Sequence, residues 1–176
     1  EVSGLLKALS VNLSKIAGDL RLMNSGPNGG IGEIKLMPMQ MGSTIMPGKV
    51  NPVIPEMIME VAMKVMSNDY AITMAASRGE FELNAFLPLI ADCILENLDL
   101  LIDGVKIFRE KCVETLVADE EKCRDNLNKT YWFATEYVPI LGYNVVAETI
   151  KNNGAEDNIA LNNRLKQMVE KNNNPE

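Results

Sequence analysis

Apolar side chains recur every three or four residues through most of the chain, which is the periodicity of amphipathic helices. The first such run predicts a helix over about residues 4–23, and it ends at the stretch NSGPNGG, where Gly and Pro terminate helices. A second helix is predicted to begin at Pro55, because proline is favourable in a first helical turn. A third helix is predicted over about residues 88–109.

These three helices predict an all-α fold built as a bundle. Each is on the order of 30 to 35 Å long at a rise of about 1.5 Å per residue, which favours roughly parallel packing. Residues 65–77 contain Asp69 as their single charge, so this part of the second helix is expected to be buried on all sides. The third helix is expected to turn its most apolar stripe inward, namely Leu89, Ile90, Ile94, Leu98, Leu101, Ile102 and Val105. Three such helices cannot cover one another, and we therefore expect association with other copies or with a missing part of the polypeptide.

The character of the sequence changes near residue 112, which divides the chain into two predicted domains. Residues 1–112 are expected to form a segment of a central helical bundle, and residues 113–176 a small C-terminal helical domain. Within the second domain, two short helices are predicted over about residues 143–152 and 156–171.

Two ion pairs are expected along the helices. Asp19 and Arg21 lie near the end of the first helix and are predicted to pair with each other. Glu60 and Lys64 have the four-residue spacing that brings opposite charges together on a helix surface.

Composition excludes several classes of function. The chain of 176 residues has a net charge of −7 and a pI near 4.8, so no basic surface is available for nucleic acid or anionic lipid. It has no long uncharged apolar run and no signal-peptide pattern, from which we expect a cytoplasmic protein. There are three cysteines without CxxC spacing and no histidine, so neither a zinc site, a disulfide framework nor a Ser-His-Asp triad is indicated.

The stretch GSTIMPGKVNP, residues 42–52, lies in a long connection between the first two predicted helices. It combines a Ser-Thr pair with Lys49 and Asn51, whose donors suit an anionic ligand. Long connections are often functional. On spacing alone, a structural loop and an anion-binding site are equally consistent with this stretch.

The same stretch is similar to the signature GSSxMPxKxNP of the fumarase/aspartase superfamily, with one fixed position changed. The resemblance extends to LSKIAGDLRLMNSGPNGGIGEI before the loop and to VMSNDYAITMAASRGEFELNAFLP after it, and covers roughly residues 1–118. MPMQMGST and NPVIPEM resemble aspartate ammonia-lyases more than class II fumarases. Argininosuccinate and adenylosuccinate lyases have less similar signatures.

The resemblance implies a homotetramer with a twenty-helix core, whose active sites are each assembled from three subunits. Such enzymes remove a proton next to a carboxylate and expel ammonia or water to give fumarate, without a metal or redox cofactor. It implies that Ser43 is the general base and that Lys49 and Asn51 hold the substrate carboxylate. Thr44 and Met46 are expected to contribute to substrate binding.

Glu56 matches the acid that pairs with a histidine of another subunit in this family. Thr44 departs from the second serine of the signature; it keeps the hydroxyl group and adds a stiffening methyl group. The other conserved segments of the family, which carry its histidine, are missing from these 176 residues. We therefore expect a C-terminal fragment of a longer enzyme that is inactive alone. A class II fumarase and a non-catalytic helical assembly module are the alternative interpretations.

Overall fold

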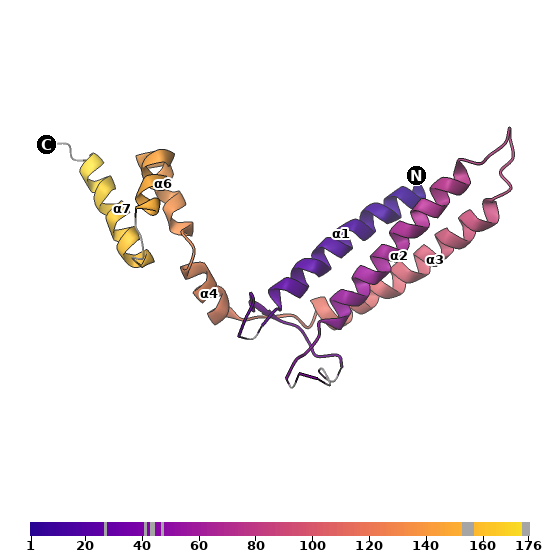
Figure 1. Ribbon diagram of the computed structural model, residues 1–176, viewed down its shortest axis with the longest axis horizontal. Coiled ribbons are helices and arrows are strands. Elements are labelled where there is room, and N and C mark those ends of the chain that lie inside the picture. Colours follow the sequence, from indigo (N-terminus) through magenta and orange to yellow (C-terminus); the bar gives the residue numbers. More distant parts are fainter. Residues whose placement is uncertain (27, 41, 43–44, 47, 153–156, 174–176) are drawn as a thin grey trace. The chain divides into compact units, whose positions relative to one another are not determined.

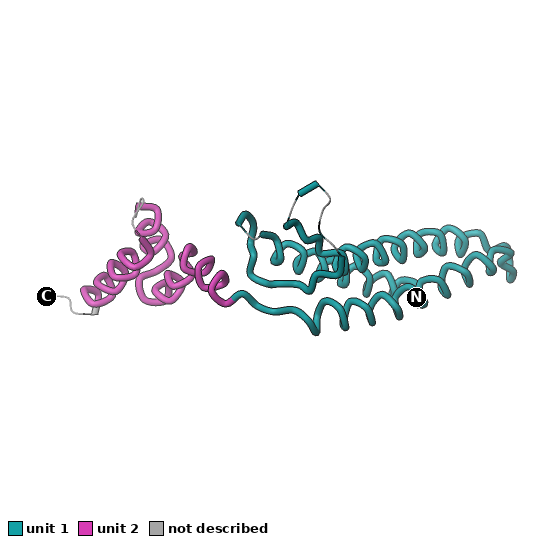
Figure 2. The backbone as a smooth tube through the Cα atoms, turned by 90° about the horizontal axis from the view of Figure 1, so that it is seen from below, with its two compact units in different colours: residues 1–119 teal, residues 120–176 magenta. Residues whose placement is uncertain are grey.

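The computed structural model describes residues 1–176 except 27, 41, 43–44, 47, 153–156 and 174–176. The chain divides into two compact units, residues 1–119 and 120–176 (Figure 2). The predicted boundary between residues 112 and 113 therefore falls inside the first unit. The fold class is helical, as predicted, and each unit is described below by itself.

The first unit contains three long helices, α1 (Val2–Met23), α2 (Val53–Ala76) and α3 (Leu87–Phe108). Their bounds lie within two residues of those predicted. Helix α2 packs against both α1 and α3, and the three helices run side by side (Figure 1). The core of this unit is formed by Leu13, Ala17, Ile58, Val65, Leu101, Phe108 and Cys112.

The buried face of α3 differs from the face that the sequence predicts. Leu98, Ile102 and Val105 were expected to point inward, yet they are 37%, 65% and 37% exposed. The buried residues of α3 are instead Cys93, Asn97, Leu101, Gly104 and Phe108. Small residues decide this orientation, because a Cβ atom at Gly104 would already lie 3.1 Å from Ile58 Cδ1. The more apolar stripe therefore faces outward within a single chain.

Helix α2 is also less enclosed than its composition predicts. Met63, Tyr70 and Met74 are at least half exposed on its outer side. The prediction of burial on all sides is wrong for the chain alone, because α1 and α3 cover only part of the helix surface.

A small two-stranded sheet holds the end of the first unit in place. Strand β1 (Ile34–Lys35) pairs in antiparallel register with β2 (Val117–Ala118), which follows a π-helical turn at Arg109–Val113. The Asp119 N–H donates to the Glu33 carbonyl oxygen at 2.8 Å. Lys35 and Asp119 add an ion pair of 2.7 Å. These contacts explain why the first unit extends to residue 119.

The second unit is built from shorter helices. It contains α4 (Glu120–Asn128), a 3₁₀ helix (Trp132–Tyr137), α5 (Val138–Leu141), α6 (Tyr143–Lys151) and α7 (Asn158–Asn173). Helices α6 and α7 correspond to the two short helices predicted from the sequence. The core of this unit consists of Phe133, Ala134, Val146, Leu161 and Leu165.

The ion pairs also differ from those expected. Asp19 pairs with Lys15, and Arg21 Nη1 lies 3.9 Å from Glu56 Oε1. Residues two apart on a helix point to opposite sides, so Asp19 and Arg21 cannot meet.

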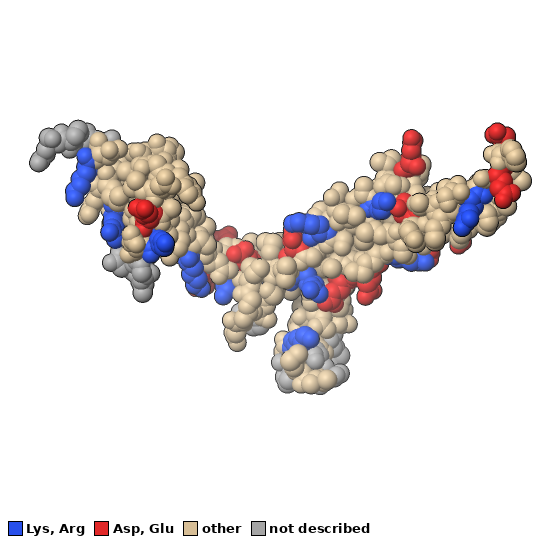
Figure 3. Space-filling view, turned by 45° about the horizontal axis from the view of Figure 1, so that its top comes forward, with Lys and Arg blue, Asp and Glu red and all other residues tan. Residues whose placement is uncertain are grey.

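Lys64 reaches across to α3, where its Nζ lies 3.0 Å from Glu96 Oε2, rather than pairing with Glu60. On the face shown in Figure 3, Lys, Arg, Asp and Glu side chains are scattered between wide uncharged areas.

Candidate functional site

The candidate site is the loop of residues 42–52, which leads directly into helix α2. Ser43 and Thr44, the predicted base and its neighbour, lie outside the described residues. Met46, Lys49 and Asn51 are described. The geometry of the site is therefore described from the positions of these three residues relative to α2.

Gly42 lies against the backbone of Lys49. A Cβ atom added at Gly42 would come within 2.2 Å of the Lys49 carbonyl oxygen, a separation that no side chain tolerates. The two residues on either side of segment 43–48 are thus in direct contact. Gly48 has φ +81° and the Lys49 N–H donates to the Met46 carbonyl oxygen at 3.2 Å, which describes a tight turn.

Lys49 and Asn51 stand immediately before the amino-terminal end of α2. Lys49 is exposed and Asn51 is half-buried, and the Asn51 carbonyl oxygen accepts the Val53 N–H at 2.9 Å. Pro52 occupies the cap position, and among the described residues no side chain caps the helix there. The positive end of the helix dipole therefore adds to the Lys49 charge, and the arrangement favours a carboxylate ligand.

Glu56 lies in the first turn of α2, and its described cationic partner is Arg21 from the last turn of α1. Both side chains are nearly half exposed, at 46% for Arg21 and 42% for Glu56. A pair this exposed contributes little stability. The Glu56 carboxylate is thus accessible beside the loop.

Two supports of the loop had no signal in the sequence. The Leu36 N–H donates to Asn24 Oδ1 at 3.0 Å, which fixes the entrance of the loop to the end of α1. Cys112 is 1% exposed in the π-helical turn and packs where Leu36 meets the segment Pro52–Pro55. Burial raises the pKa of the Cys112 thiol. Contacts of this kind join residues distant in sequence, and no local pattern predicts them.

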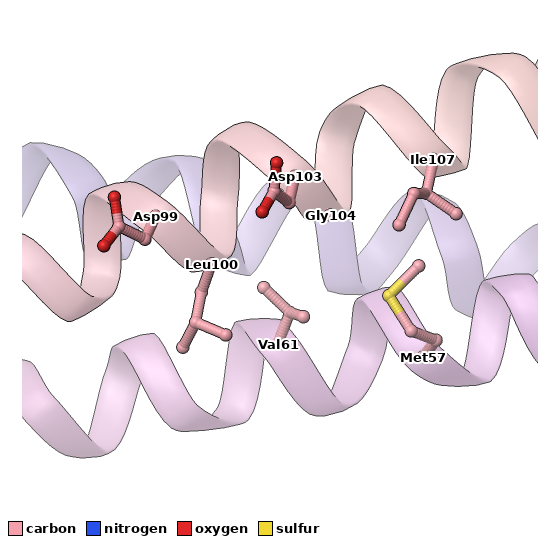
Figure 4. Close-up of a pocket in the computed structure, with 7 residues that line it drawn as sticks. All are labelled: Met57, Val61, Asp99, Leu100, Asp103, Gly104 and Ile107. Atoms are coloured by element: carbon pink, nitrogen blue, oxygen red, sulfur yellow. The ribbon is translucent and has the colours of Figure 1, made fainter.

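A separate hollow of about 240 Å³ lies between α2 and α3 (Figure 4). Leu100 and Val61 point into the space between the two helices, and Asp99 and Asp103 belong to the same hollow. Two carboxylates one turn apart repel an anion. A carboxylate ligand is therefore expected to bind at the loop and not in this hollow.

Over the described part of the chain, His, Cys, Asp and Glu side chains form no group of three that suits a metal ion. Within the same residues, no helix combines the length and hydropathy that crossing a membrane requires.

The similarity of this chain to known proteins extends to both sides of the loop. Residues 1–67 match the profile of a family described as Lyase. Aspartate ammonia-lyase from Pseudomonas aeruginosa is 47% identical over 141 residues, covering 80% of this chain and 30% of the relative. Class II fumarate hydratase 2 from the same organism is 46% identical over 149 residues, with coverages of 85% and 32%. Similarity alone does not separate the two activities.

Solved structures give the same result at the level of the fold. The chain matches a fumarate lyase:delta crystallin from Brucella melitensis with a TM-score of 0.81 and 42% identity, over 95% of this chain and 40% of that one. It matches a class II fumarase from Schistosoma mansoni with a TM-score of 0.88 and 34% identity, over 93% of this chain and 35% of that one.

The chain spans about a third of the length of these two curated relatives, 30% and 32%. The similarity covers most of the chain, runs through the signature loop, and agrees with the helical fold. The chain belongs to the fumarase/aspartase family of lyases.

Proposed function

We propose that this chain provides the signature-loop portion of an aspartate ammonia-lyase, which eliminates ammonia from L-aspartate to give fumarate. The observation that carries the proposal is the position of Lys49 and Asn51 directly before the amino-terminal end of α2. This arrangement suits a substrate carboxylate. The similarity to aspartate ammonia-lyases supports the choice of substrate.

In the proposed reaction, Ser43 in its deprotonated, alkoxide form takes a proton from the carbon next to one carboxylate of the substrate and becomes a neutral hydroxyl. The electron pair left on that carbon forms the double bond as the neighbouring carbon–nitrogen bond breaks, and ammonia leaves. The proton removal places extra charge on a group that is already negative, so the enzyme must stabilise that charge. Lys49 and Asn51 supply a cation and an amide donor for this purpose.

The remaining loop residues have supporting roles in the proposal. Thr44 and Met46 contact the substrate beside Ser43. Glu56 pairs with a histidine from another subunit, and this pairing competes with the contact that Glu56 makes to Arg21. Because the chain has no histidine, the active site needs residues from outside these 176 positions.

A homotetramer with shared active sites follows from the same proposal. Within one chain, Leu5 of α1 and Leu95 and Ile102 of α3 are 71%, 62% and 65% exposed. Apolar side chains on long helices are normally covered in the functional assembly. Helices of other subunits are the proposed cover.

Class II fumarase is the second candidate, because a class II fumarate hydratase is nearly as similar to this chain as the aspartate ammonia-lyases are. The two activities differ in the leaving group, water or ammonia, and they share the loop chemistry. Ultraviolet absorbance of the new double bond distinguishes them when L-aspartate and L-malate are supplied separately.

The test uses the polypeptide that carries these residues, assembled as it is in the cell. We expect fumarate from L-aspartate, and loss of that activity in Ser43→Ala with an unchanged assembly mass. Ser67→Ala is the matched control, because the Ser67 hydroxyl is exposed on α2 and donates to the Lys64 carbonyl oxygen of its own helix.

An unchanged rate in Ser43→Ala would remove the catalytic assignment of that residue. Fumarate from L-malate but not from L-aspartate would identify a fumarase. No product from either substrate would favour a helical assembly module.

A further inference from the structure

Two adjacent polar residues of α2 are buried where this helix meets its two neighbours. Asn68 is 5% exposed and Asp69 is 7% exposed. Consecutive residues of an α-helix point about 100° apart, so the two side chains leave α2 in different directions. We propose that Asn68 and Asp69 form a polar lock that fixes the register and the rotation of α2 between α1 and α3. The inference does not depend on the proposed function.

On the α1 side, Asp69 receives two short hydrogen bonds. Ser3 Oγ donates to Asp69 Oδ1 at 2.6 Å, and Lys7 Nζ donates to Asp69 Oδ2 at 2.6 Å. Ser3 and Lys7 are four residues apart and share one face of α1. Each carboxylate oxygen is therefore matched to one donor, and the spacing of the donors equals one helical turn.

On the α3 side, the Asn68 amide nitrogen donates twice. It lies 2.8 Å from Asn97 Oδ1 and 2.7 Å from Glu96 Oε2. Lys64, one turn before Asn68, places its Nζ 3.0 Å from the same Glu96 oxygen. Both hydrogens of the Asn68 amide are thus used, and Asn97 is completely buried at 0% exposure.

The pattern of donors and acceptors excludes the neighbouring registers. If α1 slid by one turn, Asp69 would face Lys7 and Val11 in place of Ser3 and Lys7, and it would lose one of its donors. If α3 slid by one turn, Asn68 would face Cys93 or Leu101 in place of Asn97. A buried polar group without its partner is costly, so these registers are disfavoured.

The apolar contacts of the first unit do not discriminate between helix registers that differ by one turn. The other buried residues of α2 include Ile58, Ala62, Val65, Ile72 and Ala75, which recur at intervals of three, four and seven residues along one side. Attraction between apolar surfaces is not directional, and such a stripe packs comparably after a slide of one turn. Buried polar residues are known to set helix register in coiled coils. Asn68 and Asp69 supply that selectivity here.

Distances between spin labels on α2 and α3 test the lock directly. Cysteines at the exposed positions Ser67 and Asp99 carry the labels, Cys123 is replaced by serine, and labelled chains are diluted with unlabelled ones. The native chain should give one narrow distance. The double variant Asn68→Leu with Asn97→Leu should keep its helical content and show a second distance, because a slide of one helical turn moves one label by about 5 Å along the helix axis.

Ser10→Ala is the matched control. Ser10 is as buried as Asn97, at 0% exposure, but its hydroxyl donates to the Leu6 carbonyl oxygen within α1. This variant should keep the single native distance, because no hydrogen bond between helices is removed. A second population in Ser10→Ala would show that any buried polar substitution loosens the unit, and would overturn the proposal.

The α1 side provides an independent arm, with labels at Ala8 and Ser67. Asp69→Leu combined with Ser3→Ala and Lys7→Leu should produce a second α1–α2 distance, whereas Asp69→Asn with Lys7→Gln, which retains a neutral hydrogen-bonding pair, should keep one. A single native distance in both apolar variants overturns the lock. Loss of helical content in both of them overturns it as well, because a lock selects among registers and does not create the helices.

Discussion

Gly42 and Lys49 are in backbone contact at the base of the signature loop. The position where a Gly42 side chain would begin is 2.2 Å from the Lys49 carbonyl oxygen. The Lys49 N–H also donates to the Met46 carbonyl oxygen, which closes the turn. The backbone of Lys49 is therefore held on both sides, and this fixes the position of its Cα atom. The glycine at position 42 is therefore required by a close approach and not by its φ angle.

Replacing Gly42 with alanine should separate the two ends of the loop. The added methyl group cannot share space with a backbone oxygen, so the chain must move by about 1 Å, a displacement that costs an active site on the order of 100-fold in rate. Steady-state kinetics of Gly42→Ala in the assembled polypeptide would measure the loss. Gly18→Ala in α1 is the control, because a Cβ atom there meets nothing within 4 Å. An unchanged rate in Gly42→Ala would show that the contact does not hold the loop.

The Asp69 carboxylate should make the first unit sensitive to acid. Hydrogen bonds from Lys7 and then from Ser3 lower the pKa of Asp69 below its ordinary value of 3.8. A lowered folded-state pKa gives stability that is complete above the unfolded-state value and is lost as pH falls through the folded-state pKa. Denaturant unfolding from pH 7 downward should therefore show a loss of unfolding free energy below about pH 4.

Two variants test whether Asp69 causes this loss of stability in acid. Asp69→Asn should cost about 1 to 3 kcal/mol at neutral pH, because a buried hydrogen-bonding partner is lost, and its stability should fall less steeply in acid. Ser3→Ala should retain part of the acid dependence, since the hydrogen bond from Lys7 has the larger effect on the pKa. If the free energy of unfolding fell with pH in parallel for Asp69→Asn and the native chain, the loss of stability in acid would belong to other carboxylates.

The three cysteines should differ sharply in reactivity. Cys93 and Cys112 are 6% and 1% exposed, and burial also raises the pKa of Cys112, which lowers its thiolate fraction. Cys123 is half-buried on α4. Brief treatment with iodoacetamide followed by mass spectrometry should find modification at Cys123 first, and at all three residues after unfolding. Early modification of Cys112 would mean that the base of the loop opens in the native state.

Hydrophobic periodicity was sufficient to predict the three long helices of the first unit but not which faces they pack together. The bounds of α1 and α3 follow from the repeat of apolar residues and from Gly and Pro at the ends, because these signals are local. The repeat also identifies the outward stripe of α3, with Leu98 and Ile102, as apolar. It does not say whether the same chain or another one covers that stripe, and here the less apolar face with Asn97 and Gly104 packs on α2.

The site shows the same division. Lys49, Asn51 and Glu56 lie within eight residues of one another, and their predicted roles come from the resemblance of this stretch to the family. Asn24 supports the loop across twelve residues and Cys112 does so from beyond α3. Both depend on tertiary packing, and a single sequence contains no periodic signal for such contacts.

Gly104 sets the closeness of α3 to α2, and larger side chains there should separate the two helices. The nearest atoms to an added Cβ are Ile58 Cδ1 at 3.1 Å and Val61 Cγ1 at 3.4 Å. Gly104→Ala should change the free energy of unfolding by less than about 1 kcal/mol, since the helix propensity gained offsets a contact that the Ile58 side chain can relieve. Gly104→Val should destabilise by about 1 to 3 kcal/mol through overpacking. Thermal unfolding of both variants measures the difference, and equal stabilities would contradict close packing at this point.

The outward stripe of α3 should hold the assembly together. Leu95, Leu98, Ile102 and Val105 are spaced by three and four residues and lie 37% to 65% exposed in one chain. Lysine at positions 95 and 102 places two charges where apolar contact is expected, and a buried unpaired charge opposes association. Light scattering should show a smaller assembly for the double variant, while circular dichroism stays unchanged because both positions are exposed in the single chain.

Ile159→Lys is the matched control, since Ile159 is 72% exposed on α7 of the second unit. If the sites are shared between subunits, lyase activity must fall together with the mass; activity that persists in a smaller species would show that the loop does not need a neighbouring chain.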